Sequence, residues 1–247
     1  ALEWIAPPVN RPLNQTRAKV LSCKQISPTF MRMRLIGDFS AYALPEAGLH
    51  FRFLLGPNGS DLSTLDEKGL TYWPGGLAAW HRPVFTVRRI ADTHDWVDVD
   101  IALHEGGRTT HWCRNVLPGT IVGLNGPSGS KMPIASRLGL FGDETAMPAI
   151  LRILDATPST TKAAATIAIR DPADAQEIYS SADVSLSWGE MRHEITLLKD
   201  LKNLELSQED LFVFFAAERA LADQARAYLK DSGLASSQFR VATYWTK

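Results

Sequence analysis

The stretch of sequence best suited to chemistry is LGLFGDETAMPAILRIL, residues 138–154, in which an apolar strand meets a helix. Apolar residues at 138, 140 and 141 suit a buried strand, and those at 147, 150, 151 and 154 recur at helical spacing. The polar run 142–145 between them supplies a hinge and a capping oxygen. The N–H groups and dipole of such a helix start form an anion site that suits a pyrophosphate. An ordinary strand-to-helix turn stays open, because neither GxGxxG nor a Walker lysine is present.

Composition argues against several other classes of chemistry. The 247 residues carry 26 basic and 27 acidic side chains, so the bulk charge predicts neither a nucleic-acid partner nor an anionic membrane. Cys23 and Cys113 lie far apart with no CxxC pair. This argues against a disulfide framework, a zinc ribbon or a cysteine-bound iron–sulfur cluster. The six histidines show no HExxH or HxH grouping, so we expect no metal site.

The same features bear on the compartment. Two isolated cysteines fit a reducing environment. The first residues, ALEWIAPPVN, lack a basic n-region and an apolar h-region, and the longest apolar run, 211–217, is too short to span a bilayer. We therefore expect a cytoplasmic monomer with no membrane partner.

The residues before 133 read as short strands. A proline-rich arm or leader strand, 1–16, precedes strand-like runs at 18–21, 30–36, 50–55, 84–90, 96–103 and 120–124. Residues 60–80 read as a long surface loop near a site. A short helix is expected after Gly106-Gly107, with Thr109 or Thr110 as its cap and Val116 within it, and the GPSG run 126–129 reads as a turn. Short strands at this spacing, with one helix near the end, predict an antiparallel barrel.

From residue 138 onward, strands and helices alternate. Strands are predicted at 138–141, 165–169, 184–188, 211–216 and 239–244, with a short one at 195–198, and helices at 147–154, 173–179 and 219–230. Such alternation predicts a parallel α/β sheet. We therefore expect an N-terminal antiparallel β-barrel domain, 1–135, and a C-terminal α/β parallel-sheet nucleotide-binding domain, 136–247.

This layout resembles the ferredoxin–NADP⁺ reductase superfamily. Three stretches, GDETAMPAI (142–150), AAERA (216–220) and TYW (243–245), resemble the siderophore-interacting proteins, which are FAD-dependent ferric-siderophore reductases. The runs SPTFMRMRLIGD and HEGGRTTHW…PGTIVGLNGPSGS extend the resemblance to nearly the whole chain. The resemblance implies a flavin-binding barrel and a nucleotide-binding α/β domain.

In that superfamily the flavin strand reads Arg-x-Tyr-Thr/Ser, often with a second arginine two residues on. Here Thr86 and Arg88 keep their places around Val87, Phe85 replaces the tyrosine, and Pro83 stands where the first arginine would be. The resemblance implies that Phe85 forms the flavin wall and that Thr86 donates a hydrogen bond near N5. These two are the candidate catalytic residues.

The resemblance also implies the positions of the other cofactor groups. Arg88 and the helix start at Thr109 and Thr110 would hold the FAD phosphates, with His104 ordering the turn before that helix. The remaining candidate cofactor-binding residues are Gly142, Asp143, Glu144, Thr145 and Ala146 at the phosphates of NADPH or NADH, Glu218 near the nicotinamide, and Tyr244 and Trp245 over the flavin. Core packing is the alternative for the last two.

Cofactor choice in such sheets turns on the end of the second strand, where Arg170 is followed by Asp171. This pair leaves NADH and NADPH both open. Ferredoxin, as a protein electron donor, is open too.

For the substrate, the resemblance matches Arg52 to a basic position beside the flavin, with Lys131 and Lys247 as neighbours, where they would attract an anionic ferric siderophore. Solvated surface charge is the alternative for each. The expected activity is the reduction of ferric siderophore to release Fe²⁺. The alternatives are a general flavin reductase for another acceptor, and a non-catalytic siderophore-binding protein, which Pro83 and Phe85 favour.

Overall fold

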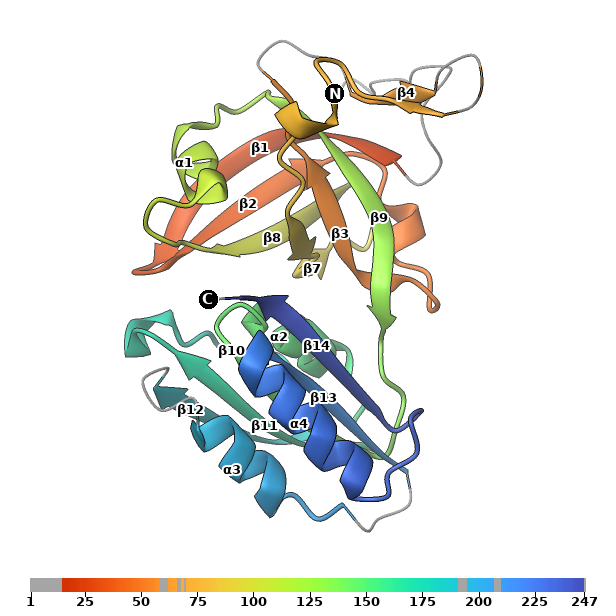
Figure 1. Ribbon diagram of the computed structural model, residues 1–247, viewed down its shortest axis with the longest axis vertical. Helices are drawn as coiled ribbons and strands as arrows, with labels where there is room; N and C mark the ends of the chain where they lie inside the picture. The colour runs from red at the N-terminus through yellow and green to blue at the C-terminus, as the bar shows by residue number, and fades with distance from the viewer. Residues whose placement is uncertain are drawn as a thin grey trace. The chain divides into compact units, whose positions relative to one another are not determined.

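Figure 1 presents the computed structural model of the protein, which describes residues 15–57, 62–65, 68, 70–190, 195–206 and 210–246. Contacts divide this chain into two compact units. The first holds the described residues through 26 together with 31–132, and the second holds 27–30 together with the described residues from 133 onward. No helix in the described ranges is long and apolar enough to cross a membrane.

The first unit is built on a seven-stranded antiparallel sheet in the order β6-β3-β9-β1-β2-β8-β7. Its strands are β1 (Gln15–Ser27), β2 (Phe30–Ile36), β3 (Gly48–Leu54), β6 (Val84–Thr86), β7 (Arg89–Ile90), β8 (Trp96–Ala102) and β9 (Ile121–Lys131). The sheet is barrel-like, although the pairings described do not close it. The predicted N-terminal antiparallel fold is thus confirmed.

Strand alternation builds the core of this unit. On β3, Phe51 and Phe53 are buried and Arg52 between them is exposed, as a period of two requires. The ring of Phe53 meets those of Phe51, Phe85 and Trp112 edge-on, with centroids 4.8, 5.6 and 5.5 Å away. Burial of a phenylalanine side chain contributes roughly 1.5–3 kcal/mol, so this aromatic cluster anchors β3.

The predicted turn at 126–129 is wrong, because these residues continue strand β9. The partner strand β3 approaches so closely that a Cβ on Gly126 would lie 2.9 Å from the Phe51 Cβ, and one on Gly48 would lie 1.9 Å from the Ser128 carbonyl oxygen. Pairing between β3 and β9 shifts register on both sides of His50. Here glycine permits close strand contact and local irregularity instead of reversing the chain.

Other elements of the first unit also depart from expectation. Helix α1 runs Arg108–Asn115 with Gly107 as its N-cap, so neither Thr109 nor Thr110 caps it, and Val116 lies outside it as the C-cap. The segment expected as a loop contains the described strands β4 (Thr64–Leu65) and β5 (Thr71–Tyr72), which pair, and a 3₁₀ turn, η2 (Leu77–Ala79). A further 3₁₀ turn, η1, spans Ser40–Tyr42.

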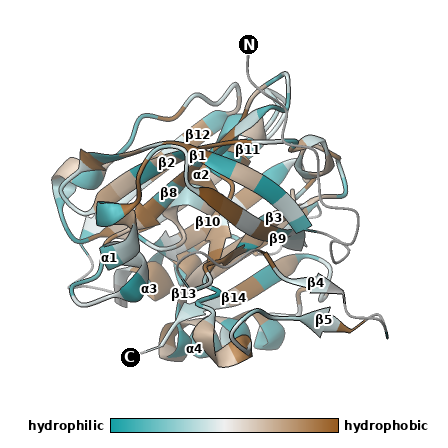
Figure 2. Cartoon of the chain, turned by 90° about the horizontal axis from the view of Figure 1, so that it is seen from above, coloured by the Kyte–Doolittle hydropathy of each residue, from teal (hydrophilic) through white to brown (hydrophobic). Residues whose placement is uncertain are grey.

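The second unit is a five-stranded parallel sheet in the order β12-β11-β10-β13-β14. The strands are β10 (Arg137–Asp143), β11 (Lys162–Ile169), β12 (Asp183–Glu190), β13 (Leu211–Glu218) and β14 (Phe239–Trp245), and the helices are α2 (Met147–Ala156), α3 (Ile195–Asn203) and α4 (Arg219–Asp231). Figure 2 shows both hydrophobic and hydrophilic segments along α4, which buries Leu221, Ala225 and Leu229. The predicted parallel α/β sheet is confirmed.

Two predicted elements of this unit are wrong. Residues 195–198 begin helix α3 instead of forming a strand, since Leu197, Leu198 and Leu201 recur at helical spacing and pack into the core. The helix expected at 173–179 is a single 3₁₀ turn, η3 (Pro172–Asp174), begun by Asp171, whose side chain accepts a hydrogen bond from the Ala173 N–H. Ala175 then leaves helical conformation with ψ 129°.

Candidate functional site

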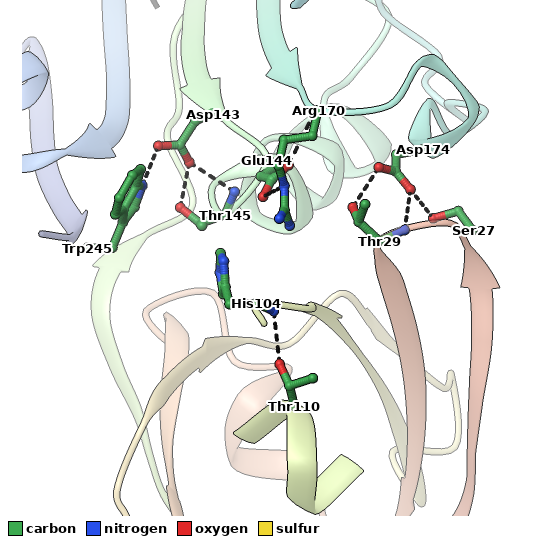
Figure 3. A network of polar contacts seen from close by, with 10 residues as sticks. All are labelled: Ser27, Thr29, His104, Thr110, Asp143, Glu144, Thr145, Arg170, Asp174 and Trp245. Atoms are coloured by element: carbon green, nitrogen blue, oxygen red, sulfur yellow. Dashed lines mark hydrogen bonds and ion pairs between the residues drawn. The ribbon is translucent and has the colours of Figure 1, made fainter. Parts of the chain in front are cut away.

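The carboxylate of Asp143, at the end of β10, is a buried hydrogen-bonding centre (Figure 3). Its Oδ1 accepts hydrogen bonds from the backbone N–H and the hydroxyl of Thr145. Its Oδ2 accepts from the Glu218 N–H at 3.1 Å and from the Trp245 indole Nε1 at 2.7 Å. Four donors satisfy the buried charge, and they join the ends of β10, β13 and β14.

Two more buried carboxylates, those of Glu144 and Asp174, accept hydrogen bonds in the second unit (Figure 3). Glu144 forms an ion pair with Arg170, 2.6 Å from Oε1 to Nε, and also accepts from the Arg170 N–H. Asp174 accepts from the Ser27 hydroxyl at 2.6 Å and from the Thr29 N–H and hydroxyl at 2.9 and 2.6 Å. All three acidic side chains therefore hold protein groups in place.

The start of helix α2 uses its own backbone donors. The N–H of Thr145 bonds to Asp143 Oδ1, that of Ala146 to the Asp143 carbonyl, and that of Met147 to the Glu144 carbonyl. Pro148 has no N–H, and the Ala149 N–H bonds back to Ala146. A phosphate approaching this turn would therefore have to displace existing hydrogen bonds.

The remaining residues predicted around this turn have structural partners too. A Cβ on Gly142 would lie 2.6 Å from the Ala146 Cβ and 2.7 Å from the Ala216 carbonyl oxygen. The packing of the second unit therefore requires a residue without a side chain at this position. Glu218 caps α4 by accepting from the Ala220 N–H at 2.7 Å. Tyr244 lies half-buried on β14, next to Trp245.

The start of helix α1 in the first unit differs from that of α2 in how its backbone N–H groups are used. An open pocket of about 490 Å³ lies here, lined by Gly106, Gly107, Arg108, Thr110, His111 and Arg114. No described side chain caps α1, and its first hydrogen bond runs from the His111 N–H to the Gly107 carbonyl. The N–H groups of the first three helical residues precede that bond. Their dipole and the exposed Arg108 and Arg114 give this pocket a positive character that suits an anion.

The turn before α1 is fixed by side-chain and backbone hydrogen bonds. Thr110 accepts from the His104 N–H at 2.9 Å, and the His104 carbonyl accepts from the Gly107 N–H at 3.0 Å, while the His104 side chain is exposed. His81 Nε2 and the Thr109 hydroxyl hydrogen-bond at 2.8 Å. Burial, and then the charge of Arg108, lower the pKa of His81.

Sequence reasoning identified Thr109 and Thr110 but missed four residues of this region, His81, Arg108, His111 and Arg114. A usable signal was present for the last three. Arg108, His111 and Arg114 recur at intervals of three along the sequence directly after two glycines, which places them on one face of a short helix. His81 carried no such signal, because it reaches Thr109 from a distant part of the chain.

The predicted flavin strand is mostly buried. Phe85 is half-buried opposite Phe51 of β3, whereas Thr86, Val87 and Arg88 are 4, 0 and 1% exposed. The Val87 N–H bonds to the Leu49 carbonyl and the Arg88 N–H to the Asp98 carbonyl. Between these residues the chain therefore crosses from β3 to β8.

The three predicted substrate cations are not assembled by the described chain. Exposed Arg52 pairs with Asn125 of β9, whereas exposed Lys131 pairs with Gly48 at the other end of β3. On β3, Gly48 and Arg52 are four positions apart, about 13 Å along a strand. Lys247 lies outside the described residues. The Arg52 guanidinium instead donates to the Arg82 carbonyl at 2.7 Å.

Within the described ranges, no three His, Cys, Asp or Glu side chains gather to hold a metal ion. Comparison with known families decides the relationship of the chain. Residues 135–247 match the model described as siderophore-interacting protein, and residues 19–131 match the siderophore-interacting FAD-binding domain. The chain belongs to the siderophore-interacting protein family. Its FAD-binding domain contains the α1 pocket and the predicted flavin strand.

Relatives of this siderophore-interacting protein match along most of its length. The ferric vibriobactin reductase ViuB of Vibrio cholerae is 26% identical over 239 residues, which cover 91% of this chain and 86% of that protein. The NADPH-dependent ferric-chelate reductase of Escherichia coli is 24% identical over 247 residues, covering 92% and 91%. A siderophore utilization protein from T. fusca shares the fold with a TM-score of 0.81 at 23% identity, covering 96% and 95%.

Proposed function

We propose that this siderophore-interacting protein is an FAD-dependent reductase that takes ferric siderophore as substrate and releases Fe²⁺ in the cytoplasm. Electrons come from NADPH or NADH, or from ferredoxin. The observation that carries the proposal is the anion pocket at the start of α1, within the region that matches a siderophore-interacting FAD-binding domain. The names of the two ferric reductases above support the choice of substrate.

The α1 pocket fits the pyrophosphate of FAD. Arg108 and Arg114 supply positive charge, and the helix start supplies uncapped N–H donors. A Cβ on Gly106 would meet nothing within 4 Å, so the backbone of this turn is open to a ligand. Thr109 and Thr110, held by His81 and the His104 backbone, keep the turn ordered.

Bound FAD supplies the redox chemistry, exchanging electrons in pairs with a hydride donor and singly with iron. The half-buried ring of Phe85 is the proposed wall for the isoalloxazine, and the Thr86 hydroxyl is the proposed donor near N5. Arg88, at 1% exposure, is buried at the end of this strand, between β6 and β7. We therefore assign Arg88 a buried supporting charge within the flavin strand and give the phosphate contact to Arg108.

On the substrate side, iron chemistry explains why reduction releases the metal. Siderophores hold Fe³⁺ through hard oxygen ligands, which bind the softer and less charged Fe²⁺ more weakly. We propose Arg52 as the principal attraction for an anionic complex, with Lys131 and Lys247 as additional cations. The Arg82 carbonyl holds the Arg52 guanidinium at the β3 and β6 edge.

For the electron donor, the hydrogen bonding at α2 is informative. The backbone donors of residues 145–147 are already used, and Asp143 and Glu144 add negative charge. Ferredoxin needs no pyrophosphate site there and stays a candidate, whereas the name of the NADPH-dependent ferric-chelate reductase supports a nucleotide donor. A nucleotide donor would have to draw on Arg170, which already pairs with Glu144.

The test separates the half-reactions. The purified protein is examined for flavin absorbance, and the released cofactor is identified by mass. Flavin reduction by NADPH, NADH or reduced ferredoxin is then followed without oxygen, and reoxidation by a ferric siderophore is followed with a ferrous chelator present. We expect FAD, and Fe²⁺ formed in step with reoxidation. Failure to bind FAD at any concentration would support a siderophore-binding protein, and reoxidation by other acceptors alone would support a general flavin reductase.

A further inference from the structure

The two cysteines of the chain belong to one packed region of the first unit, although about 90 residues separate them in the sequence. Cys23 lies on β1 and Cys113 on α1, and the two thiols are near enough for each to change the pKa of the other. Cys113 is 2% exposed within the core cluster of the first unit, and half-buried Cys23 packs against that cluster. Both thiols are free. Two adjacent free thiols, one accessible and one buried, are the arrangement that a reversible disulfide requires.

The environment gives the two sulfur atoms different roles. The hydrogen bond with Cys113 lowers the pKa of Cys23, against the opposing effect of burial. The same hydrogen bond and burial raise the pKa of Cys113. Cys23 is therefore the better source of thiolate, which is the form that attacks an oxidant, and its partial exposure admits a small reagent. Cys113 stays protonated beside it.

We propose that Cys23 and Cys113 form a redox-sensitive pair that a hydroperoxide converts into an intramolecular disulfide. The Cys23 thiolate attacks the peroxide, whose O–O bond breaks, giving a sulfenic acid on Cys23 and hydroxide. The Cys113 sulfur then displaces the sulfenic oxygen, which leaves as water with the Cys113 proton. The hydroxide takes up the proton first released by Cys23. Two thiols and one hydrogen peroxide thus give one disulfide and two waters.

The disulfide would fix α1 against β1. Helix α1 has eight residues, and Cys113 lies five residues after Arg108 and directly before Arg114, which both line the anion pocket. A covalent bond at this point limits the excursions of the helix and closes a loop of about 90 residues, which restricts the unfolded chain. The first unit should therefore unfold at a higher temperature when oxidised. This inference does not depend on the proposed reductase activity.

The experiment treats the purified full-length protein with hydrogen peroxide and counts thiols, with intact mass measured in parallel. We expect both thiols to be lost together, the mass of the monomer to fall by two hydrogens, and dithiothreitol to restore both. Because the chain has no other cysteine, an intramolecular disulfide has a single assignment. The unfolding temperature should rise by several degrees in the oxidised protein and return on reduction.

Cys113→Ser and Cys23→Ser are matched controls. Cys113→Ser should accumulate a sulfenic acid on Cys23, trapped by a dimedone-type reagent, and the alkylation of Cys23 should shift to higher pH. Cys23→Ser should leave Cys113 unreactive in the folded protein. Retention of two thiols in the wild type under peroxide that oxidises Cys23 in Cys113→Ser would overturn the proposal. So would disulfide-linked dimers as the sole oxidised product, or equally fast disulfide formation in urea.

Discussion

The indole Nε1 of Trp245 lies 2.7 Å from Oδ2 of Asp143, a contact between residues 102 positions apart. It ties β14, the edge strand of the parallel sheet, to β10 at its centre. The same oxygen also accepts from the Glu218 N–H of β13, which lies between them. A single carboxylate thus sets the relative positions of three strand ends in the second unit.

Trp245→Phe tests this contact. Phenylalanine keeps the ring but removes the donor to a charged acceptor, which costs about 1.5–3 kcal/mol. We expect that loss in the free energy of unfolding of the second unit, measured by urea titration. Trp188→Phe is the control, since Trp188 is half-buried on the opposite edge strand, β12, and forms no hydrogen bond with another described side chain. Equal losses in the two variants would remove the special role of the Asp143 contact.

The anion pocket predicts the effect of Arg108→Ala. Loss of a charge-assisted hydrogen bond to phosphate should weaken FAD binding by about tenfold or more, measured by fluorescence titration of the apoprotein. Arg108 is exposed, so the unfolding temperature without FAD should not change. Lys24→Ala, an exposed cation on β1, should leave FAD affinity unchanged. An Arg108→Ala protein that binds FAD as the wild type does would exclude this pocket as the phosphate site.

Unlike Arg108, Arg88 should contribute to the stability of the FAD-free protein. Its side chain is among the largest that are fully buried, and Arg88→Ala would leave a cavity in the first unit. We expect a lower unfolding temperature in the apoprotein, in addition to weaker retention of FAD. Scanning calorimetry of the FAD-free variant distinguishes this from a purely ligand-contact role, for which the apoprotein would unfold as the wild type does.

Because Arg52 and Lys131 lie apart, the contribution of each to substrate attraction can be tested with a separate variant. Arg52→Ala should slow reoxidation of the reduced flavin by an anionic ferric siderophore and leave flavin reduction unchanged. Lys131→Ala, about 13 Å away along β3, should have a smaller effect. The wild-type rate should fall as salt rises, because exposed charges are screened over about 10 Å at 0.1 M. If both variants reoxidise at the wild-type rate, these cations do not attract the substrate.

His81 predicts a pH effect. Its pKa is lowered below 6.5 in the folded protein, so between that lowered value and 6.5 the unfolded chain binds more protons. Stability therefore rises with pH through this window, and the contribution is complete above about 6.5 and lost as pH falls through the folded pKa. We expect unfolding temperatures at pH 5.5 and 7.5 to differ more in the wild type than in His81→Gln. The same difference in both proteins would contradict a contribution of His81 to the pH dependence of stability.

The close approach of β3 and β9 predicts contrasting glycine variants. A Cβ on Gly48 would lie 1.9 Å from a backbone oxygen, so Gly48→Ala must separate the strands. Gly189→Ala is matched, because Gly189 also lies in a strand yet its Cβ would meet nothing nearer than 4.0 Å. We expect little soluble folded protein from the first and wild-type yield from the second, judged by circular dichroism.

Local patterns sufficed for most elements and failed where distant segments meet. The alternation around Arg52 and the helical spacing after Met147 could be predicted, because both depend on neighbouring residues. The strand at 126–129 could not, since glycines that allow a close neighbour have the composition of a turn. At the candidate site, sequence identified the segment of Asp143, but the donors to that carboxylate arrive from 75 and 102 positions away.

The place of β9 in its sheet bears on how the protein is made. A nascent chain releases β1, β2 and β3 first, yet β9 lies between β3 and β1 and is the last strand of the first unit in the sequence. Until Lys131 has left the ribosome, β1 and β3 each expose an unpaired edge, which is a template for wrong pairing. The first unit therefore completes its sheet late in its own translation, and a pause before Ile121 would leave two open edges for a chaperone to cover.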